Sequence, residues 1–371
     1  MKRLTAALGL TTDLTDAHPS VTPIFQASAF SSDSPYFYTR KDNPNSLEFE
    51  HVVRTLEEAS YAISTTTGMA AINLVMELVE PGDTLVINQL IYGCSYKYFV
   101  NLCQRRKITL IVQDLSNKES WKDIPFDTTM ILFETPTNPF LKTINIARLR
   151  EYVNNRKKKP LIVVDNTWAT PLYQQPLKHG ADISLHSATK FFSGHSDVMG
   201  GVILTDSQDL YERLKEIRFY SGAILPPFSA WLLRRSLQTL TLRLRHHEKT
   251  SRQMVDFLSE KESIDKVYFP EIDGEQLTGY SGILFFEFSE AFSSYYEAFR
   301  DSLKLFKTGT GMACVISMIA QPYSGSHASM SEKEKKAMGI GKNLVRLCFG
   351  LEDIEDIKQD INQALPDRLI K

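Results

Sequence analysis

The chain has 371 residues, of which 43% are hydrophobic and 23% charged. This length predicts two domains of unequal size, and this composition excludes disorder on a large scale. The 42 basic and 44 acidic residues leave a net charge of −2, which gives no electrostatic reason to expect nucleic acid or a membrane surface as partner. No apolar run approaches the ~18 residues of a membrane span, and the first residues do not resemble a signal peptide, so we expect a cytoplasmic protein.

The first part of the chain, residues 1–45, is rich in Thr, Ser, Pro and Asp and indicates an arm that lies on another surface. Between residues 60 and 205, short β-branched runs alternate with longer amphipathic stretches, as in a mostly parallel sheet with helices on both faces, and the domain that contains them is expected over residues 46–230. This pattern predicts a large α/β domain. The expected strands are 61–65, 84–88, 108–113, 129–134, 161–165, 182–187 and 201–205.

A different pattern begins near residue 230 and predicts a smaller α+β domain over residues 231–371. Apolar residues recur every three or four positions without interruption over 230–260, which is typical of one long helix. Strand patterns follow over 266–269 and 282–288, then a helix near 290–303 and a closing helix from Asp353. The four cysteines have no metal-ligand spacing, so we expect free thiols and no metal site.

The first chemical signal is the run DISLHSATK, in which a strand leads to Ser187, Thr189 and Lys190. Hydroxyl groups can bind a phosphate while a lysine amine with a lowered pKa attacks a carbonyl group, and lysine is the residue that carries pyridoxal phosphate. Taken alone, the run is a weak signal, and it favours a solvated loop lysine at position 190.

Two further segments strengthen this interpretation. Asp165 ends the apolar strand LIVVD, where a protonated pyridine nitrogen would be a suitable partner, although a helix cap is the alternative. In STTTGMAAI, the turn before Gly68 opens a helix whose first N–H groups suit a phosphate dianion, and a simple helix cap would have a similar sequence. Only the conjunction of the three segments favours a phosphate-bearing cofactor.

With these and other motifs, nearly the whole chain resembles the Cys/Met-metabolism family of fold-type I pyridoxal-phosphate enzymes. The resemblance implies an aminotransferase-like fold with a mostly parallel seven-stranded sheet in the large domain, and activity as a lyase or a γ-substituting transferase. The matching runs are YTRKDNP, TTGMAAI, ETPTNP, VDNTWATP, GADISLHSATKFFSGHSDVMGG, GAILPPFSAWLLRRSLQTLTLR and LVRLCFGLED.

The resemblance also implies roles for individual residues. Lys190 is expected to carry pyridoxal 5'-phosphate as a Schiff base and to move protons, with Asp165 on the pyridine nitrogen. Tyr92 is expected to stack on the ring and act as an acid, and Asn138 to bond the phenolic oxygen. The expected phosphate ligands are Gly68, Met69, Ser187, Thr189 and, from a neighbouring subunit, Tyr38 and Arg40. A homodimer would then be the smallest active unit, and the family favours a homotetramer.

The expected substrate is a small amino acid whose carboxylate binds Arg346. In relatives that handle cystathionine, acidic residues stand where this chain has Phe37 and Thr310, so a thioether such as methionine is the easier guest. Cys94 after the stacking tyrosine also resembles methionine γ-lyases, whereas Arg218 does not match them, and Gly311 replaces a serine that normally helps to bind the carboxylate. We expect γ-elimination from methionine or a related homoserine derivative; γ-replacement as in cystathionine γ-synthase, cystathionine cleavage by a γ- or β-lyase, and a regulatory protein without turnover stay open.

Overall fold

A seven-stranded sheet with the strand order β1-β7-β6-β5-β4-β2-β3 forms the centre of the larger lobe. The computed structural model describes residues 2–9 and 18–366. Strands β2 to β6 pair in parallel, and β7 is antiparallel to both β6 and β1. The expected mostly parallel sheet is confirmed. Its strands are β1 (Tyr61–Thr65), β2 (Thr84–Asn88), β3 (Thr109–Gln113), β4 (Thr128–Glu134), β5 (Leu161–Asp165), β6 (Ile183–His186) and β7 (Gly201–Thr205).

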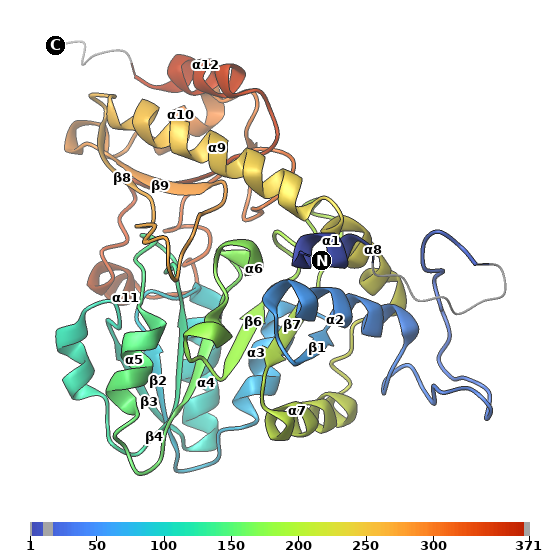
Figure 1. Ribbon diagram of the computed structural model, residues 1–371. Coiled ribbons are helices and arrows are strands. Elements are labelled where there is room, and N and C mark those ends of the chain that lie inside the picture. The colour runs from blue at the N-terminus through green and yellow to red at the C-terminus, as the bar shows by residue number, and fades with distance from the viewer. Residues whose placement is uncertain (1, 10–17, 367–371) are drawn as a thin grey trace.

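Helices cover both faces of this sheet (Figure 1). On one face, α3, α4 and α7 bury side chains such as Phe99 and Leu214 against the strands. On the other face, α2, α5 and α8 bury Phe49 and Leu149. The helices of this lobe are α2 (Pro44–Glu57), α3 (Gly68–Met76), α4 (Gly93–Arg106), α5 (Ile146–Val153), α6 (Thr170–Tyr173), α7 (Gln208–Ser221) and α8 (Pro227–Leu237), with 3-10 turns η1 (Lys118–Asp123) and η2 (Pro176–His179).

The smaller lobe contains a five-stranded sheet with the order β10-β11-β12-β9-β8. Side chains of α9, α10 and α12 share one hydrophobic cluster with β9 and β12 and cover its outer face. The inner face meets the larger lobe, where Phe285 stacks on Trp168 with ring centroids 5.9 Å apart. Its elements are α9 (Leu240–Ser259), β8 (Ile264–Tyr268), β9 (Ile283–Phe288), η3 (Glu290–Phe292), α10 (Tyr296–Ser302), β10 (Lys307–Thr308), β11 (Met318–Ala320), α11 (Glu332–Ala337), β12 (Leu344–Cys348) and α12 (Ile354–Ala364).

The long helix expected over 230–260 is two helices, so the expectation of one helix is wrong. Helix α8 ends at Leu237 and α9 begins at Leu240. Thr239 between them has φ −105° and ψ 4°, outside helical geometry. The carbonyl oxygen of Ser236 accepts a hydrogen bond from the side chain of Arg243 at 2.9 Å, which replaces a helical bond at the break.

The N-terminal segment lies partly on its own chain. Helix α1 (Arg3–Gly9) contacts α2, and Arg3 donates to the carbonyl oxygen of Leu56 at 3.1 Å. Further along, Trp231 donates its indole N–H to Thr22 at 2.9 Å, and Figure 1 shows the stretch up to α2 extending outward beside α8. The domain limits at residues 45 and 230, and the contact of the arm with a neighbouring subunit, stay predictions.

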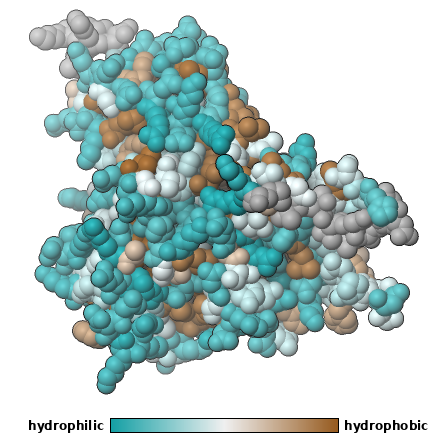
Figure 2. All heavy atoms as spheres, viewed as in Figure 1, coloured by the Kyte–Doolittle hydropathy of each residue, from teal (hydrophilic) through white to brown (hydrophobic). Residues whose placement is uncertain are grey.

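The surface is mostly hydrophilic, as expected from the charged fraction of the sequence. On the face drawn in Figure 2, hydrophilic residues predominate and hydrophobic residues lie in small groups. None of the helices described over residues 2–9 and 18–366 combines the length and the apolarity that crossing a membrane requires.

Candidate active site

A cavity of ≈ 490 Å³ lies where strands β4, β5 and β6 end and the smaller lobe meets the larger one. The carboxyl ends of parallel strands are the usual place for a ligand in such a sheet. The structure brings most of the predicted site residues together here. The lining includes Gly68, Met69, Tyr92, Cys94, Asn138, Asp165, Ser187, Thr189, Lys190, Thr310 and Arg346.

Asp165 is a half-buried acid that lines this cavity. It ends β5 and pairs in register with Glu134, which ends β4. Thr167 donates both its backbone N–H, at 3.0 Å, and its hydroxyl, at 2.5 Å, to the same Asp165 oxygen. Burial raises the pKa of Asp165 despite these hydrogen bonds. A cation placed in the cavity would therefore find a carboxyl group that is fixed and poorly solvated.

Lys190 lies in an irregular turn that follows β6. Its backbone N–H donates to Ser187 at 3.1 Å, and its carbonyl accepts from Gly194 at 2.8 Å. Burial lowers the pKa of the Lys190 amine, and the positive charge of Arg346 lowers it further. A lysine with a lowered pKa has a larger neutral fraction and is a better nucleophile toward a carbonyl group.

One corner of the cavity has the character of an anion site. Helix α3 begins at Gly68, where Thr67 caps the helix by accepting from Ala70 at 3.0 Å. A Cβ atom at Gly68 would lie only 2.7 Å from Cβ of Ser187. The helix start and Ser187 are therefore in close contact, and glycine is needed there. N–H groups at the helix start and the Ser187 and Thr189 hydroxyls border the same cavity.

Tyr92 is positioned by the residues on either side of it. Its backbone N–H donates to Glu134 at 2.8 Å, and α4 begins at the next residue. A Cβ atom at Gly93 would lie 2.3 Å from the carbonyl oxygen of Ser326, so the helix start is packed directly on the smaller lobe. Burial and a hydrogen bond with Cys94 raise the pKa of Tyr92 to about 12, and the phenol keeps its proton at neutral pH.

Arg346 comes from the smaller lobe. Side chains alternate along β12, which puts Arg346 on the same inner face as Leu344 and Cys348. Its Nη2 donates to the carbonyl oxygens of Thr310 at 3.2 Å and Gly311 at 3.0 Å. Its buried Nε has no hydrogen-bond partner among the described residues. One edge of the guanidinium is thus anchored, and a donor remains for a carboxylate.

The replacement of serine by Gly311 has a steric explanation. A Cβ atom at Gly311 would lie 2.5 Å from the sulfur of Met318. Met318 therefore fills the space that a side chain at position 311 would need. The backbone carbonyl of Gly311 still contacts Arg346.

Four predicted residues are absent from the lining of this cavity: Gly311, which directly follows the lining residue Thr310, and three residues of the N-terminal arm. Phe37 is 71% exposed and borders a separate hollow together with Phe219. Arg40 lies over the ring of Tyr38, 5.3 Å from its centroid, and over the ring of Phe219 at 4.8 Å. Within one chain, the structure does not bring these arm residues to the predicted phosphate corner.

Glu134 and Thr167 are among the polar residues of the site that were not predicted. Glu134 is the first residue of the ETPTNP run, and its position at a buried strand end, like that of Asp165, was an available signal. Its pKa is raised well above the usual value by burial and by the neighbouring Asp165. Thr167 also supports Ser187, whose backbone N–H donates to the Thr167 hydroxyl at 2.8 Å. Its spacing of two residues from Asp165 is typical of an Asx turn.

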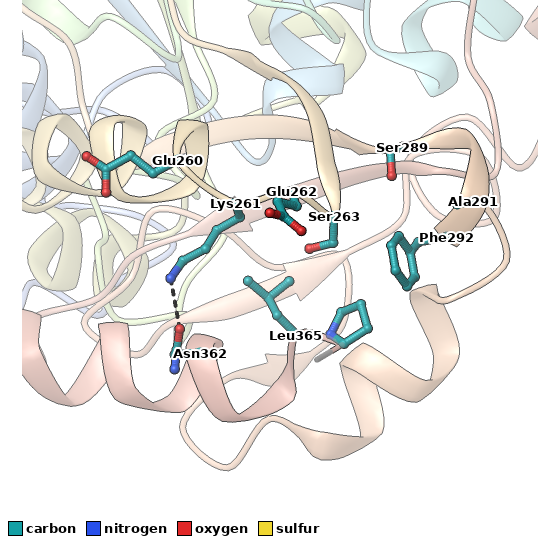
Figure 3. Close-up of a pocket in the computed structure, with 10 residues that line it drawn as sticks. Glu260, Lys261, Glu262, Ser263, Ser289, Ala291, Phe292, Asn362 and Leu365 are labelled. Atoms are coloured by element: carbon teal, nitrogen blue, oxygen red, sulfur yellow. Dashed lines mark hydrogen bonds between the residues drawn. The ribbon is translucent and has the colours of Figure 1, made fainter. Parts of the chain in front are cut away.

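A second hollow of ≈ 390 Å³ lies in the smaller lobe, between the ends of α9 and α12 and the start of β8 (Figure 3). Lys261 reaches across part of it and donates to Asn362 at 2.8 Å. The lining of this hollow includes none of the predicted site residues. The described residues also contain no group of three His, Cys, Asp or Glu side chains suited to a metal ion.

The residues of the main cavity fit pyridoxal phosphate. Asp165 offers a half-buried acid for the pyridine nitrogen, Lys190 an amine for the aldehyde, and the corner at Gly68 a place for the phosphate. Asn138 lines the same cavity, and its buried Oδ1 has no hydrogen-bond partner among the described residues. The ring therefore has polar groups on several sides.

Comparisons with known proteins agree with this fit. The family model described as "Cys/Met metabolism PLP-dependent enzyme" matches residues 6–366. The chain is 36% identical to a cystathionine gamma-lyase of Bacillus subtilis (strain 168), over 98% of this chain and 99% of that protein. It is 33% identical to an L-methionine gamma-lyase of Fusobacterium nucleatum subsp. polymorphum, over 92% of each.

A solved structure is equally similar. The cystathionine gamma synthase from Xanthomonas oryzae pv. oryzae, in complex with cystathionine, aligns with a TM-score of 0.93 and 34% identity. The alignment covers 98% of this chain and 97% of that one. The fold is therefore the fold type I expected from the sequence, and the cofactor is pyridoxal phosphate. The chain belongs to the Cys/Met-metabolism family of pyridoxal-phosphate-dependent enzymes.

Proposed function

We propose that this enzyme cleaves the carbon–sulfur bond at the γ-carbon of methionine or of a related apolar homoserine derivative. The observation that supports this choice is the charge of the cavity wall. Among the described lining residues, the only carboxyl groups are Glu134 and Asp165, both at the strand ends. The wall contributed by Thr310, Met312 and Met199 is uncharged. A distal ammonium group would have no partner there, whereas a thioether needs none.

The proposed roles follow from position. Pyridoxal phosphate, when bound, withdraws electrons from the α-carbon of the amino acid. Lys190 holds the cofactor and then, with its lowered pKa, takes and returns protons at the substrate carbons. Arg346 orients the substrate carboxylate with its free edge. Tyr92 keeps its proton to neutral pH and can donate it to the leaving sulfur.

The remaining cofactor contacts complete the proposal. Asp165 pairs with the pyridine nitrogen and Asn138 with the phenolic oxygen. The phosphate binds the start of α3, at Gly68 and Met69, and the hydroxyls of Ser187 and Thr189. Cys94, Thr310 and the backbone at Gly311 border the substrate, and these groups serve elimination and replacement equally.

A homodimer is part of the proposal. Tyr38 and Arg40 lie on an exposed arm outside the cavity of their own chain, next to the exposed Phe37. An arginine and a tyrosine hydroxyl there can bind the cofactor phosphate of a second copy, with Phe37 beside the substrate. Dimers would pair into tetramers. All four cysteines are free, which suits a reducing, cytoplasmic compartment.

Cystathionine is the second candidate substrate, and the identity of 36% to a protein named cystathionine gamma-lyase favours it. Cystathionine carries a second ammonium group at its far end. A carboxyl group from the neighbouring copy would have to replace the acid that position 310 lacks. Replacement with cysteine, as in cystathionine γ-synthases, stays a third alternative.

The test is the release of 2-oxo acid by the purified, cofactor-loaded protein. Methionine, cystathionine and O-acetylhomoserine are compared in parallel, each with and without cysteine. We expect 2-oxobutanoate from methionine without cysteine, at a higher kcat/KM than from cystathionine. Formation of cystathionine from the ester and cysteine, with no release from methionine, would contradict the lyase proposal.

A further inference from the structure

Arg243 is a buried cation that none of the roles above uses. It lies near the start of α9 and is only 3% exposed. Its guanidinium donates to three uncharged oxygens: Nη1 to the carbonyl of Phe191 at 2.8 Å, Nη2 to the carbonyl of Ser236 at 2.9 Å, and Nε to the Thr239 hydroxyl at 3.1 Å. Burial lowers its pKa to about 10. Burying a charge without a carboxylate partner costs free energy, so we expect the guanidinium of Arg243 to have a specific role.

One of these acceptors belongs to the turn that carries the cofactor lysine. Phe191 directly follows Lys190, and Gly194 N–H closes the turn on the carbonyl of Lys190 at 2.8 Å. Gly194 has φ +68°, and a Cβ atom there would lie 2.1 Å from Nη1 of Arg243. The turn is therefore shaped around the guanidinium, and glycine at this position makes the contact possible.

The break between α8 and α9 supplies the second anchor. In a continuous helix, the carbonyl of Ser236 would accept from the backbone four residues later. Because α8 ends at Leu237, that carbonyl accepts instead from the side chain of Arg243, and also from the backbone N–H of Thr239 at 3.2 Å. Arg243 therefore connects the start of α9 to the lysine turn through a fixed fork of donors.

We propose that Arg243 is a positioning residue for Lys190, which fixes the turn so that the lysine amine faces the aldehyde of the cofactor. It acts through the backbone of Phe191 and the shape of Gly194. The positive charges and thiols that shift the pKa of Lys190 are those of Arg346, Cys348 and Cys314, and Arg243 is not among them. A change at Arg243 should therefore alter the reach of Lys190 rather than its charge.

The same turn is linked to the substrate side. The carbonyl of Gly194 accepts from the backbone N–H of Val315 at 3.0 Å. Val315 belongs to the loop whose residues Thr310 and Gly311 hold Arg346. Movement of the lysine turn would reach the carboxylate site, so loss of Arg243 should also raise the KM for the amino acid.

The experiment compares two ligands of the cofactor-free full-length protein. Pyridoxal phosphate can bond to Lys190, whereas deoxypyridoxine phosphate has a methyl group in place of the aldehyde and cannot. For Arg243→Met we expect the Kd of pyridoxal phosphate to rise roughly tenfold or more, as for loss of a hydrogen bond to a charged donor. The Kd of deoxypyridoxine phosphate should stay within about twofold, because the side chain of Arg243 bonds to Phe191, Ser236 and Thr239, none of which is among the described residues that line the cavity.

Three variants serve as references. Arg234→Met removes another buried arginine, which pairs with Glu48 at 3.1 Å away from the lysine turn, and should lower stability without changing the ratio of the two Kd values. Arg243→Lys keeps the positive charge and a single donor group. Its ratio of the two Kd values should lie between those of the wild type and Arg243→Met. Gly194→Ala displaces the guanidinium from the other side and should act like Arg243→Met. The last two variants keep the test available if Arg243→Met does not fold.

Borohydride reduction followed by mass spectrometry of the Lys190 peptide gives a second readout, and the trapped fraction should fall in Arg243→Met. Equal weakening of both ligands, or an unchanged ratio in Arg243→Met and Gly194→Ala, would overturn the proposal. The inference rests on Lys190 as the cofactor lysine. That assignment fails separately if Lys190→Ala leaves wild-type preference for pyridoxal phosphate over its deoxy analogue.

Discussion

Asp165 carries a poorly solvated carboxyl group, and burial raises its pKa above the ordinary value near 3.8. A raised pKa means that the folded protein binds this proton more tightly than the unfolded chain. The resulting destabilisation is absent at low pH and grows as the pH rises above the ordinary value. We therefore expect Asp165→Asn to raise the unfolding free energy of the cofactor-free protein at about pH 8 more than at about pH 5.

Turnover of Asp165→Asn should fall by roughly 10²- to 10³-fold, as for loss of one preorganised charge at a reaction centre. Urea denaturation at the two pH values and steady-state kinetics measure the two effects. A cofactor-free variant that is less stable than the wild type at the higher pH would show that Asp165 has a stabilising partner instead.

Thr310 provides a second test at the scale of single residues. Thr310→Glu introduces a carboxylate into the uncharged wall of the cavity, where it can pair with a distal ammonium group. We expect the ratio of kcat/KM for cystathionine to that for methionine to rise roughly tenfold or more. Thr308→Glu is the matched control, since Thr308 is exposed on β10 and outside the cavity lining. The same ratio in both glutamate variants would rule out a local effect of position 310.

Single residues were predictable where a motif and a strand end coincide. Lys190, Asp165 and the helix start at Gly68 all lie at the ends of elements with clear periodicity, and the cavity contains them all. Glu134 has the same location but was missed, because the residues after it formed the more conspicuous motif. The hydrogen bonds of Thr167 depend on side-chain direction, which periodicity does not encode.

At the scale of elements, the loop that contains Gly311 packs against Met318 of strand β11. Gly311→Ser should lower the free energy of unfolding by about 1 kcal/mol, the low end for overpacking, because the new side chain meets only the flexible end of Met318. The KM for the amino acid should rise too, since this loop holds Arg346. In combination with Met318→Ala, the change should cost less than the sum of the two single effects, because Met318→Ala removes the side chain that the serine meets. Denaturation of the single and double variants measures the coupling, and simple additivity would contradict the proposed contact.

The elements themselves show which patterns are reliable. Each of the seven expected strands lies within one residue of the observed one, because β-branched runs are short and sharply bounded. The break between α8 and α9 was not visible, because the apolar period continues through it and a hydrogen bond from Arg243 replaces the helical one. The antiparallel direction of β7 also depends on how the chain connects in space.

At the scale of the whole molecule, the proposed dimer makes each site depend on two chains. Lys190→Ala and Arg40→Ala should each be poorly active alone. After mixing and subunit exchange, a hybrid dimer has one site with both residues intact, and activity should return to about a quarter of the wild-type value. A mixture of Lys190→Ala with Asp165→Asn is the control, since both changes lie in the same chain's cavity and in every hybrid each site keeps one of them. No recovery in the first mixture would place Arg40 outside the site.

The N-terminal arm is the part of the molecule whose contacts were hardest to predict from the sequence of one chain. Its composition indicated a surface-bound segment, and helix α1 and Thr22 do contact their own chain. Whether Arg40 reaches a phosphate depends on a second copy, which no local pattern describes.

The two adjacent acids at the ends of β4 and β5 have a thermodynamic consequence. Burial raises both pKa values, and the neighbouring Asp165 raises that of Glu134 further. A pyridinium nitrogen beside Asp165 would lower the pKa of Asp165 again, so cofactor uptake should be coupled to proton exchange with the solvent. Calorimetric titrations in buffers of different ionisation enthalpy should therefore give different apparent heats for the same cofactor, and Asp165→Asn should reduce the difference. Part of the free energy of cofactor binding therefore depends on the protonation of the acids at the ends of β4 and β5.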